Sequence, residues 1–258
     1  MTIPKVPTTR MKGSRFYVDP ESNKTVPGVT SVLNMLPKDF LKWWAAKLVA
    51  ETAVEQAGNW IGLAMNGDRE GAIDYLKRAP TRNTGAAANR GTEAHDLFEH
   101  MSAGVTPTRV HPDMEPFKRW YGEFLDTMQP EFIHLEQTVW NDNPGYAGSF
   151  DWAARIQGEL VLGDNKTTRS GVFPETALQL NAYAFADHLM MGDGTRDPNH
   201  EYTGAAVLHI VPEGWKLVPV LLDRDVIMPV FEALLKVHTW DKELARTVLG
   251  TPIASGGD

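Results

Sequence analysis

Three charged residues near the middle of the chain have the types and spacing of a metal-dependent hydrolytic site. The segment Gly148-Ser149-Phe150-Asp151 is followed thirteen residues later by Asp164-Asn165-Lys166. Asp164 and Lys166 stand two apart on a predicted strand, so their side chains share one face. A hairpin would bring Asp151, on the preceding strand, close to both. Two carboxylates and one ammonium suit a hard divalent cation such as Mg²⁺, which takes oxygen ligands.

Such a site can hydrolyse a phosphodiester. The metal polarises the phosphodiester and generates hydroxide, while the lysine orients or activates the water. The alternative for Asp164-Asn165-Lys166 taken alone is a surface salt bridge, and for so short a motif that alternative is the favoured one.

Two further pairs of residues shift this balance. Gln179 and Tyr183 lie four apart on the next predicted helix and therefore share a face of it. Upstream, Gly91 and His95 have the same spacing on another predicted helix. In isolation, His95 is more often a capping or packing histidine than a ligand, and the Gln-x-x-x-Tyr pair is equally weak.

Together, and in this order, the four segments resemble the RecB-type nucleases of the PD-(D/E)XK superfamily. Those nucleases show a Gly-x-x-x-His helix, a Gly-x-x-Asp strand, an Asp-x-Lys strand and a helix with Gln-x-x-x-Tyr. The string from Val161 to Thr168 also resembles the strand of that family that ends in Asp-x-Lys-Thr. The resemblance covers residues 85–185, and its specificity comes from the combination of motifs.

The resemblance implies a metal centre for Mg²⁺ or Mn²⁺. His95, Asp151 and Asp164 would be the ligands, with the backbone carbonyl of Asn165 completing the shell. Lys166 would position the nucleophilic water and stabilise developing charge. Asp151, Asp164 and Lys166 together would be the catalytic set.

Further residues would support the site or touch DNA. Gln179 and Tyr183 would orient the active site or contact the DNA backbone. Glu136 stands where relatives often carry an acidic residue, although a solvated charge on an edge strand is an equal alternative. Three arginines could neutralise phosphates or be ordinary solvated charges: Arg82, Arg90 and Arg169.

A predicted helix over residues 40–56 offers another kind of DNA contact. Trp43 and Trp44 lie beside Lys42 and Lys47, and aromatic rings next to basic residues can stack bases and hold phosphates. Tryptophans on such a helix more often belong to a core, so we expect a core position for them.

The chain departs from one branch of the family. The CRISPR adaptation nucleases and some helicase-linked relatives hold an iron–sulfur cluster through four cysteines, and this chain has none. A thiolate-bound cluster is therefore excluded. The chain resembles a free-standing, phage-type DNA exonuclease of recombination, repair or phage DNA metabolism. The partners expected are DNA and a single-strand annealing or recombination protein.

Other functions remain open at this point. His95-Asp96 is the dipeptide of the HD phosphohydrolases, but their site needs an earlier histidine, and His95 is the first in this chain. A non-cleaving DNA-binding recombination partner on the same scaffold is a second alternative, although it would have no need for the complete Asp151, Asp164 and Lys166 set. An endonuclease, or an enzyme that acts on RNA, is a third.

The order of predicted elements indicates an α/β fold. The resemblance implies a restriction-endonuclease-like core with a central mixed sheet flanked by helices. We expect a single nuclease domain over residues 1–258: a helical portion at 30–128, a catalytic sheet region at 129–222 and a C-terminal helix at 223–247. A short strand is predicted at 14–18. Within the sheet region, three successive strands are predicted at 131–140, 146–157 and 159–166, residues 174–190 are predicted to be helical, and residues 192–200 to form a loop. Residues 250–258 are expected to be a disordered tail.

Composition is consistent with a cytoplasmic protein, in the host cytoplasm if it is phage-encoded. The sequence has no apolar run of 18 residues, and its first twelve residues lack the apolar core of a secretion signal. The formal net charge of the chain is -8. Since proteins that coat nucleic acid are usually basic, DNA would have to be held by local basic residues.

Overall fold

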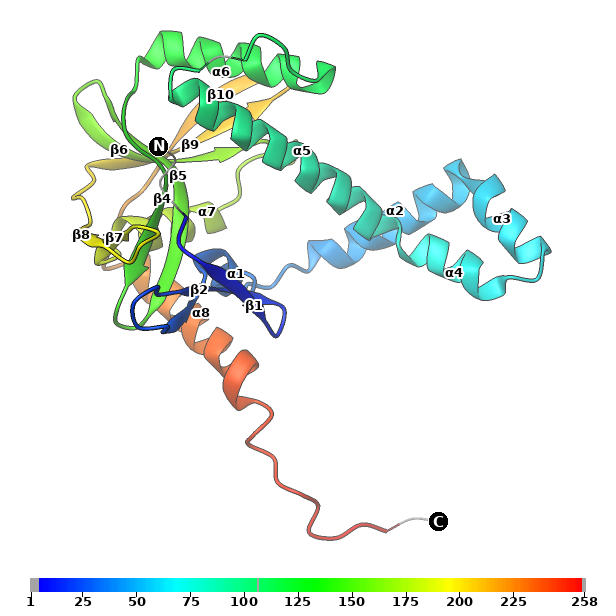
Figure 1. Ribbon diagram of the computed structural model, residues 1–258. Coiled ribbons are helices and arrows are strands. Elements are labelled where there is room, and N and C mark those ends of the chain that lie inside the picture. The colour runs from blue at the N-terminus through cyan, green and yellow to red at the C-terminus, as the bar shows by residue number, and fades with distance from the viewer. Residues whose placement is uncertain (1–4, 106, 257–258) are drawn as a thin grey trace. The chain divides into compact units, whose positions relative to one another are not determined.

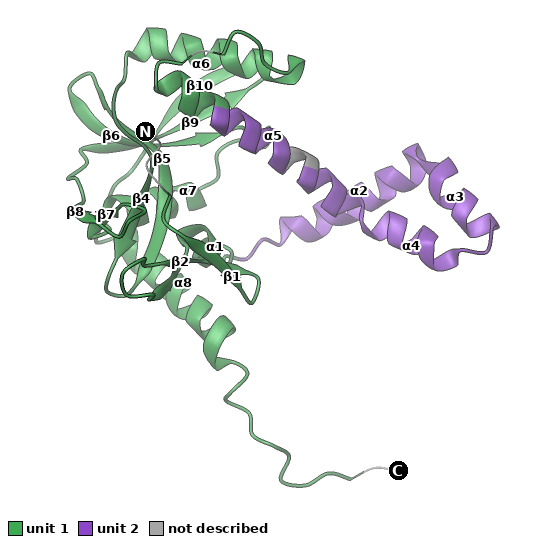
Figure 2. Cartoon of the chain, viewed as in Figure 1, with its two compact units in different colours: residues 1–36, 97–258 green, residues 37–96 purple. Residues whose placement is uncertain are grey.

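The computed structural model describes residues 5–105 and 107–256, without the side chains of residues 86 and 87. Residues 1–4 of the N-terminal segment and residues 257–258 of the expected disordered tail lie outside the described residues. The chain divides into two compact units, one of residues 1–36 and 97–258 and the other of residues 37–96 (Figure 2). The expected α/β class with a mixed central sheet flanked by helices is confirmed in the larger unit.

The central sheet has seven strands in the order β10-β9-β6-β5-β4-β7-β8 (Figure 1). Its neighbouring strands are antiparallel except β6 and β9, which run parallel. The bounds are β4 (Glu131–Asn141), β5 (Tyr146–Ile156), β6 (Glu159–Lys166), β7 (His188–Met190), β8 (Arg196–Pro198), β9 (Gly204–Val211) and β10 (Gly214–Val220). The three strands expected at 131–140, 146–157 and 159–166 are therefore confirmed.

A two-residue turn sets the register between β5 and β6. Gln157 and Gly158 both have positive φ, 52° and 90°. Such turns match the twist of the strands that they join. The turn pairs Ile156 with Glu159, and the ladder continues to Trp152 opposite Gly163.

A smaller antiparallel sheet precedes the central one and contains β1 (Thr8–Met11), β2 (Ser14–Val18) and β3 (Thr25–Pro27). Only β2 is expected from the sequence. Helix α1 (Val29–Leu33) follows and packs with α7 (Glu175–Ala184) and α8 (Met228–Thr239) in the main hydrophobic core. Helix α6 (Glu115–Met128) packs on β9 and β10.

The prediction of a helix over residues 174–190 is wrong for the second half of that range. α7 ends at Ala184, and His188–Met190 forms β7 instead, paired with β4. The Asn199 amide donates hydrogen bonds to the carbonyl groups of Tyr183, Ala184 and Ala186. It thereby satisfies carbonyls that the end of a helix leaves without an intrahelical partner. The loop expected at 192–200 likewise contains β8.

The expected C-terminal helix is shorter than its predicted range. α8 begins at Met228, because Asp223 accepts backbone hydrogen bonds from residues 225 and 226 in a turn before it. A π-helical turn, η2 (Trp240–Leu244), follows α8. Among the described residues, no helix combines the length and the apolar character needed to cross a bilayer.

The unit of residues 37–96 is helical. It contains α2 (Phe40–Glu55), α3 (Ala57–Met65), α4 (Arg69–Lys77) and the first part of α5 (Ala79–Ser102). α3 is not expected from the sequence. The expected core position is wrong for Trp43, whose residue surface is 80% exposed, whereas Trp44 is half-buried.

His238 joins α8 to the small sheet and predicts a dependence of stability on pH. It is 1% exposed, and its Nε2 lies 3.1 Å from the Ser14 hydroxyl. Burial, together with the positive charge of Lys242, lowers the pKa of His238 below its ordinary value of 6.5, and Asp241 and Glu243 oppose this only in part. The unfolded chain therefore binds more protons than the folded chain below pH 6.5.

We expect the free energy of unfolding to decrease as the pH falls from 7.5 through 6.5 towards the folded-state pKa, measured by urea unfolding at each pH. His238→Gln should flatten this decrease, because glutamine does not titrate. The control is His111→Gln at an exposed histidine, which should keep the wild-type profile. An unchanged profile in the His238 variant would contradict the assignment.

Candidate active site

The register of β5 and β6 brings the two predicted carboxylates to neighbouring positions. Since Trp152 pairs with Gly163, the next position of the ladder sets Asp151 opposite Asp164. Side chains at opposed positions share a face of the sheet. The Asp151 carboxylate also accepts a hydrogen bond of 2.5 Å from the Asn165 backbone N–H. The expectation that the two residues lie on adjacent strands is confirmed.

Packing between Trp152 and the β6 backbone holds this register. A Cβ atom at Gly163 would overlap the Trp152 indole ring, so only glycine fits there. The indole N–H donates to the Asn165 side-chain oxygen at 3.0 Å. Residues on both sides of Asp164 are therefore fixed by one tryptophan. The proposed metal contact of the Asn165 backbone carbonyl stays a prediction.

Four of the predicted residues form one hydrogen-bonded network. Lys166 Nζ lies 2.7 Å from one Asp164 carboxylate oxygen, and the Gln179 amide donates to the other at 2.8 Å. The same Gln179 nitrogen lies 3.2 Å from the Tyr183 hydroxyl. Asp164 is only 3% exposed, so this network replaces the water that its charge has lost.

Gly148 leaves room for the tyrosine of this network. A Cβ atom there would overlap the Tyr183 ring. The glycine of the Gly-x-x-Asp strand and the tyrosine of the helical motif are therefore spatial partners, although 35 residues separate them. This contact places α7 against β5.

Sequence reasoning missed a row of hydroxyl groups beside Gly148. The Ser149 hydroxyl lies 2.9 Å from that of Thr138 on β4 and 3.3 Å from that of Tyr17 on β2. Ser149 stands inside the Gly-x-x-Asp motif, which was the only signal available. Tyr17 and Thr138 come from distant segments that carry no motif.

The electrostatics of the site follow from burial and from the cluster of carboxylates. Burial disfavours the charged form of Lys166, but the Asp164 carboxylate and then Asp151 outweigh it, so the pKa of Lys166 is raised. Burial also raises the pKa of Tyr183 well above its ordinary value, and the Gln179 hydrogen bond opposes this only in part. Lys166 is therefore a stable cation and Tyr183 a neutral hydroxyl at neutral pH.

Glu136 lies close to Asp151, which does not fit the alternative that it is a solvated charge on an edge strand. It is a half-buried residue of β4, with an unusual positive φ of 49°. Its carboxylate and that of Asp151 have oxygens within 4.8 Å of each other. Burial and then the Asp151 charge raise the pKa of Glu136, while Lys5, at 3.3 Å, opposes the shift. A pair of acidic groups in such a setting could hold a metal ion.

An open pocket of about 470 Å³ adjoins Glu136. It is lined in part by Lys5, Glu99, Phe132, Gln137 and Met190. Glu136 itself lines the pocket, so a molecule bound there would meet this carboxylate.

The remaining predicted residues are not part of the hydrogen-bonded network around Asp164 within the larger unit. His95, Arg82 and Arg90 belong to the unit of residues 37–96, and their roles as ligand or DNA contacts stay predictions. Arg169 is exposed and lies 3.1 Å from Glu213. This pair fits the reading of Arg169 as a solvated charge, and its contact with DNA is untested.

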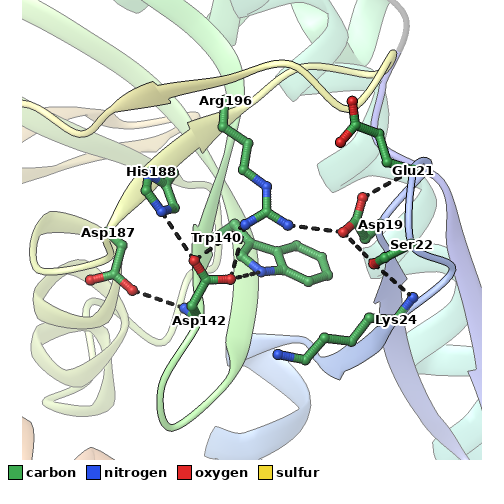
Figure 3. Close-up of polar contacts among 9 residues, drawn as sticks. All are labelled: Asp19, Glu21, Ser22, Lys24, Trp140, Asp142, Asp187, His188 and Arg196. Carbon is green, nitrogen blue, oxygen red and sulfur yellow. Dashed lines mark hydrogen bonds and ion pairs between the residues drawn. The ribbon is translucent and has the colours of Figure 1, made fainter.

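A second group of metal-ligand types, Asp142, Asp187 and His188, already has cationic and hydrogen-bonding partners (Figure 3). Arg196 donates to both Asp142 oxygens, at 2.9 and 3.2 Å, and His188 contacts the same carboxylate at 3.1 Å. Arg196 also reaches the buried Asp19, at 2.9 Å. The arrangement ties the turn after β2 to the β4–β5 turn, and a guanidinium supplies the positive charge there.

Comparisons with known proteins add little. No family model and no curated protein matches the chain. Among solved structures, SSO0001 is similar with a TM-score of 0.36 and 13% sequence identity, over 64% of this chain and 68% of that chain. A likeness at this level supports no conclusion about fold family or function.

The contact between Gly148 and Tyr183 gives a testable expectation for stability. Gly148→Ala should lower the free energy of unfolding by about 1–3 kcal/mol, because the added methyl group overpacks a buried site. Urea unfolding would measure this. Gly214→Ala is a matched control on β10, where an added Cβ meets no atom within 4 Å. Equal effects of the two substitutions would show that Tyr183 does not constrain position 148.

Proposed function

We propose that this protein is a metal-dependent nuclease that hydrolyses phosphodiester bonds in DNA. The observation that carries the proposal is the buried Asp164 carboxylate held between Lys166 and Gln179, with Asp151 at the neighbouring strand position. Burying such charges costs free energy that a purely structural role would not require. The order of motifs that resembles RecB-type nucleases supports the same function.

The donor set fits a hard divalent cation. Asp151, Asp164 and Glu136 supply carboxylate oxygens, which Mg²⁺ and Mn²⁺ prefer. The resemblance adds His95, whose imidazole would favour Mn²⁺ as well. When bound, the metal would supply Lewis-acid polarisation of the phosphodiester and a more acidic water.

The residues of the chain have distinct tasks in this proposal. Lys166 remains protonated beside Asp164 and therefore donates hydrogen bonds to the attacking water or to a phosphate oxygen as negative charge develops. Gln179 holds the Asp164 carboxylate in one orientation through its amide N–H. Tyr183, as a neutral hydroxyl, fixes Gln179 in turn. Both are positioning residues.

The resemblance to free-standing relatives supports an exonuclease that works in recombination, repair or phage DNA metabolism, with an annealing protein as a partner. A non-cleaving DNA-binding protein and an endonuclease are the competing functions. The following two experiments distinguish them.

Asp164→Asn and Lys166→Ala should each reduce Mg²⁺- or Mn²⁺-dependent cleavage of linear DNA by about 10²-fold or more, because each removes a charge that stabilises the transition state. Lys166→Ala should keep metal binding in calorimetric titration, because an ammonium has no lone pair to offer. The controls are Asp126→Asn and Lys216→Ala at exposed positions. Wild-type protein that leaves DNA uncut with either metal would favour the non-cleaving alternative.

End dependence can be measured with one DNA sequence in two forms. We expect end-labelled linear DNA to be degraded and a covalently closed circle of the same sequence to survive under the same conditions. The expectation rests on the resemblance, because free-standing relatives of this size are mostly exonucleases, which act from a DNA end. Rapid nicking of the circle, at a rate matching the linear form, would establish an endonuclease instead.

A further inference from the structure

One face of α2 exposes aromatic rings next to a lysine. Phe40, Trp43 and Lys47 follow the spacing of residues that share a helical face. We call these three residues the α2 stripe. The residues Phe40 and Trp43 are 54% and 80% exposed, and the Lys47 side chain is 73% exposed. Since tryptophan is usually well buried, a ring this exposed has its faces open to a stacking partner.

The charges around the α2 stripe favour an anionic ligand. Lys42 and Lys47 stand on either side of Trp43 in sequence. Their partners are Asp39, at 3.1 Å, and Glu51, at 3.5 Å, in pairs that are open to solvent. Such exposed pairs contribute little free energy. Both lysines can therefore exchange their carboxylates for phosphates at small cost.

The unit as a whole is less acidic than the rest of the chain. Residues 37–96 contain eight basic and eight acidic side chains, so the net charge of -8 arises from the other unit. A polyanion would meet less repulsion at residues 37–96 than at the acidic remainder.

We propose that the unit of residues 37–96 binds single-stranded nucleic acid through the α2 stripe. The inference rests on the proposed nuclease function and adds to it a preference for single-stranded substrates. The Trp43 ring would stack on an unpaired base, and Lys42 and Lys47 would contact the adjoining phosphates. In a duplex the faces of the bases are covered by their neighbours, so the ring would find no partner there.

A lipid surface fits α2 less well. Helices that lie in a membrane interface have one apolar and one strongly polar face. The apolar residues of α2 are instead distributed around the helix. Association with a second copy of the chain through the same rings is an outcome that the experiment separates.

The test measures binding of the full chain in EDTA, so that hydrolysis plays no part. Fluorescence anisotropy would follow a labelled dT20 oligonucleotide and, separately, a blunt duplex of equal length. Trp43→Ala should weaken binding of dT20 by about tenfold and leave duplex binding unchanged. Trp43→Phe should restore most of the affinity, because it keeps a ring. Lys42→Ala and Lys47→Ala should each reduce the dependence of dT20 binding on salt.

The matched control is Met65→Ala, which removes an equally exposed apolar side chain from α3. It should bind dT20 as the wild type does. The inference is overturned if Trp43→Ala binds dT20 with wild-type affinity, if it loses affinity for dT20 and duplex equally, or if Met65→Ala loses as much. It is also overturned if Trp43→Ala changes the sedimentation coefficient of the protein without changing dT20 binding, because the stripe is then a protein interface.

Failure of this inference and failure of the proposed function give different results. A chain that binds dT20 through Trp43 but never cuts DNA would refute the nuclease and keep the inference. A chain that cuts DNA with Mg²⁺, but whose affinity for dT20 is unchanged by Trp43→Ala, would keep the nuclease function and refute the inference.

Discussion

The ion pair between Asp164 and Lys166 is the interaction on which the arrangement around it depends. A carboxylate that is 3% exposed has lost its water, and its charge is tolerated only with a cation and hydrogen-bond donors at short range. Lys166 supplies the cation from the same strand, and Gln179 supplies a donor from α7. The need for a donor to the Asp164 carboxylate therefore also determines where α7 packs. Gly148, which has no side chain, lets Tyr183 of α7 approach β5 closely.

The same requirement explains why the register of β5 and β6 tolerates no slip. A shift by one residue would turn every side chain of a strand to the other face and separate Asp151 from Asp164. The register is specified at both ends of the ladder. The positive φ values of Gln157 and Gly158 set it at the turn, and the fit of Trp152 over Gly163 sets it beside the carboxylates. Two independent constraints for one register are typical of a site that needs precise geometry.

Much of this could be predicted from the sequence because the signals are local. β5 and β6 flank a recognisable turn at Gln157-Gly158, and the spacings of Asp164 with Lys166 and of Gln179 with Tyr183 follow from strand and helix periods. β7 could not be predicted, since three residues carry too little pattern and their strand forms by pairing with β4 and β8. For Glu136 only the resemblance suggested a place near the site, and the contacts of Tyr17 were hidden, because both depend on tertiary packing. The core position predicted for Trp43 was wrong because the residue type favours burial, and only the fold shows that this side chain is exposed.

The acidic net charge and a polyanionic substrate become compatible when the charge is considered by unit. Carboxylates that bind cations repel DNA until those cations arrive, so a site rich in acid is a poor place for first contact. Residues 37–96, with balanced charge and exposed rings, lack this disadvantage. In the proposed function, affinity would come from stacking and a few phosphate contacts, and chemistry from the buried carboxylates. Net charge then says little about whether the protein binds nucleic acid, because counterion release depends on the lysines that touch phosphate and on no others.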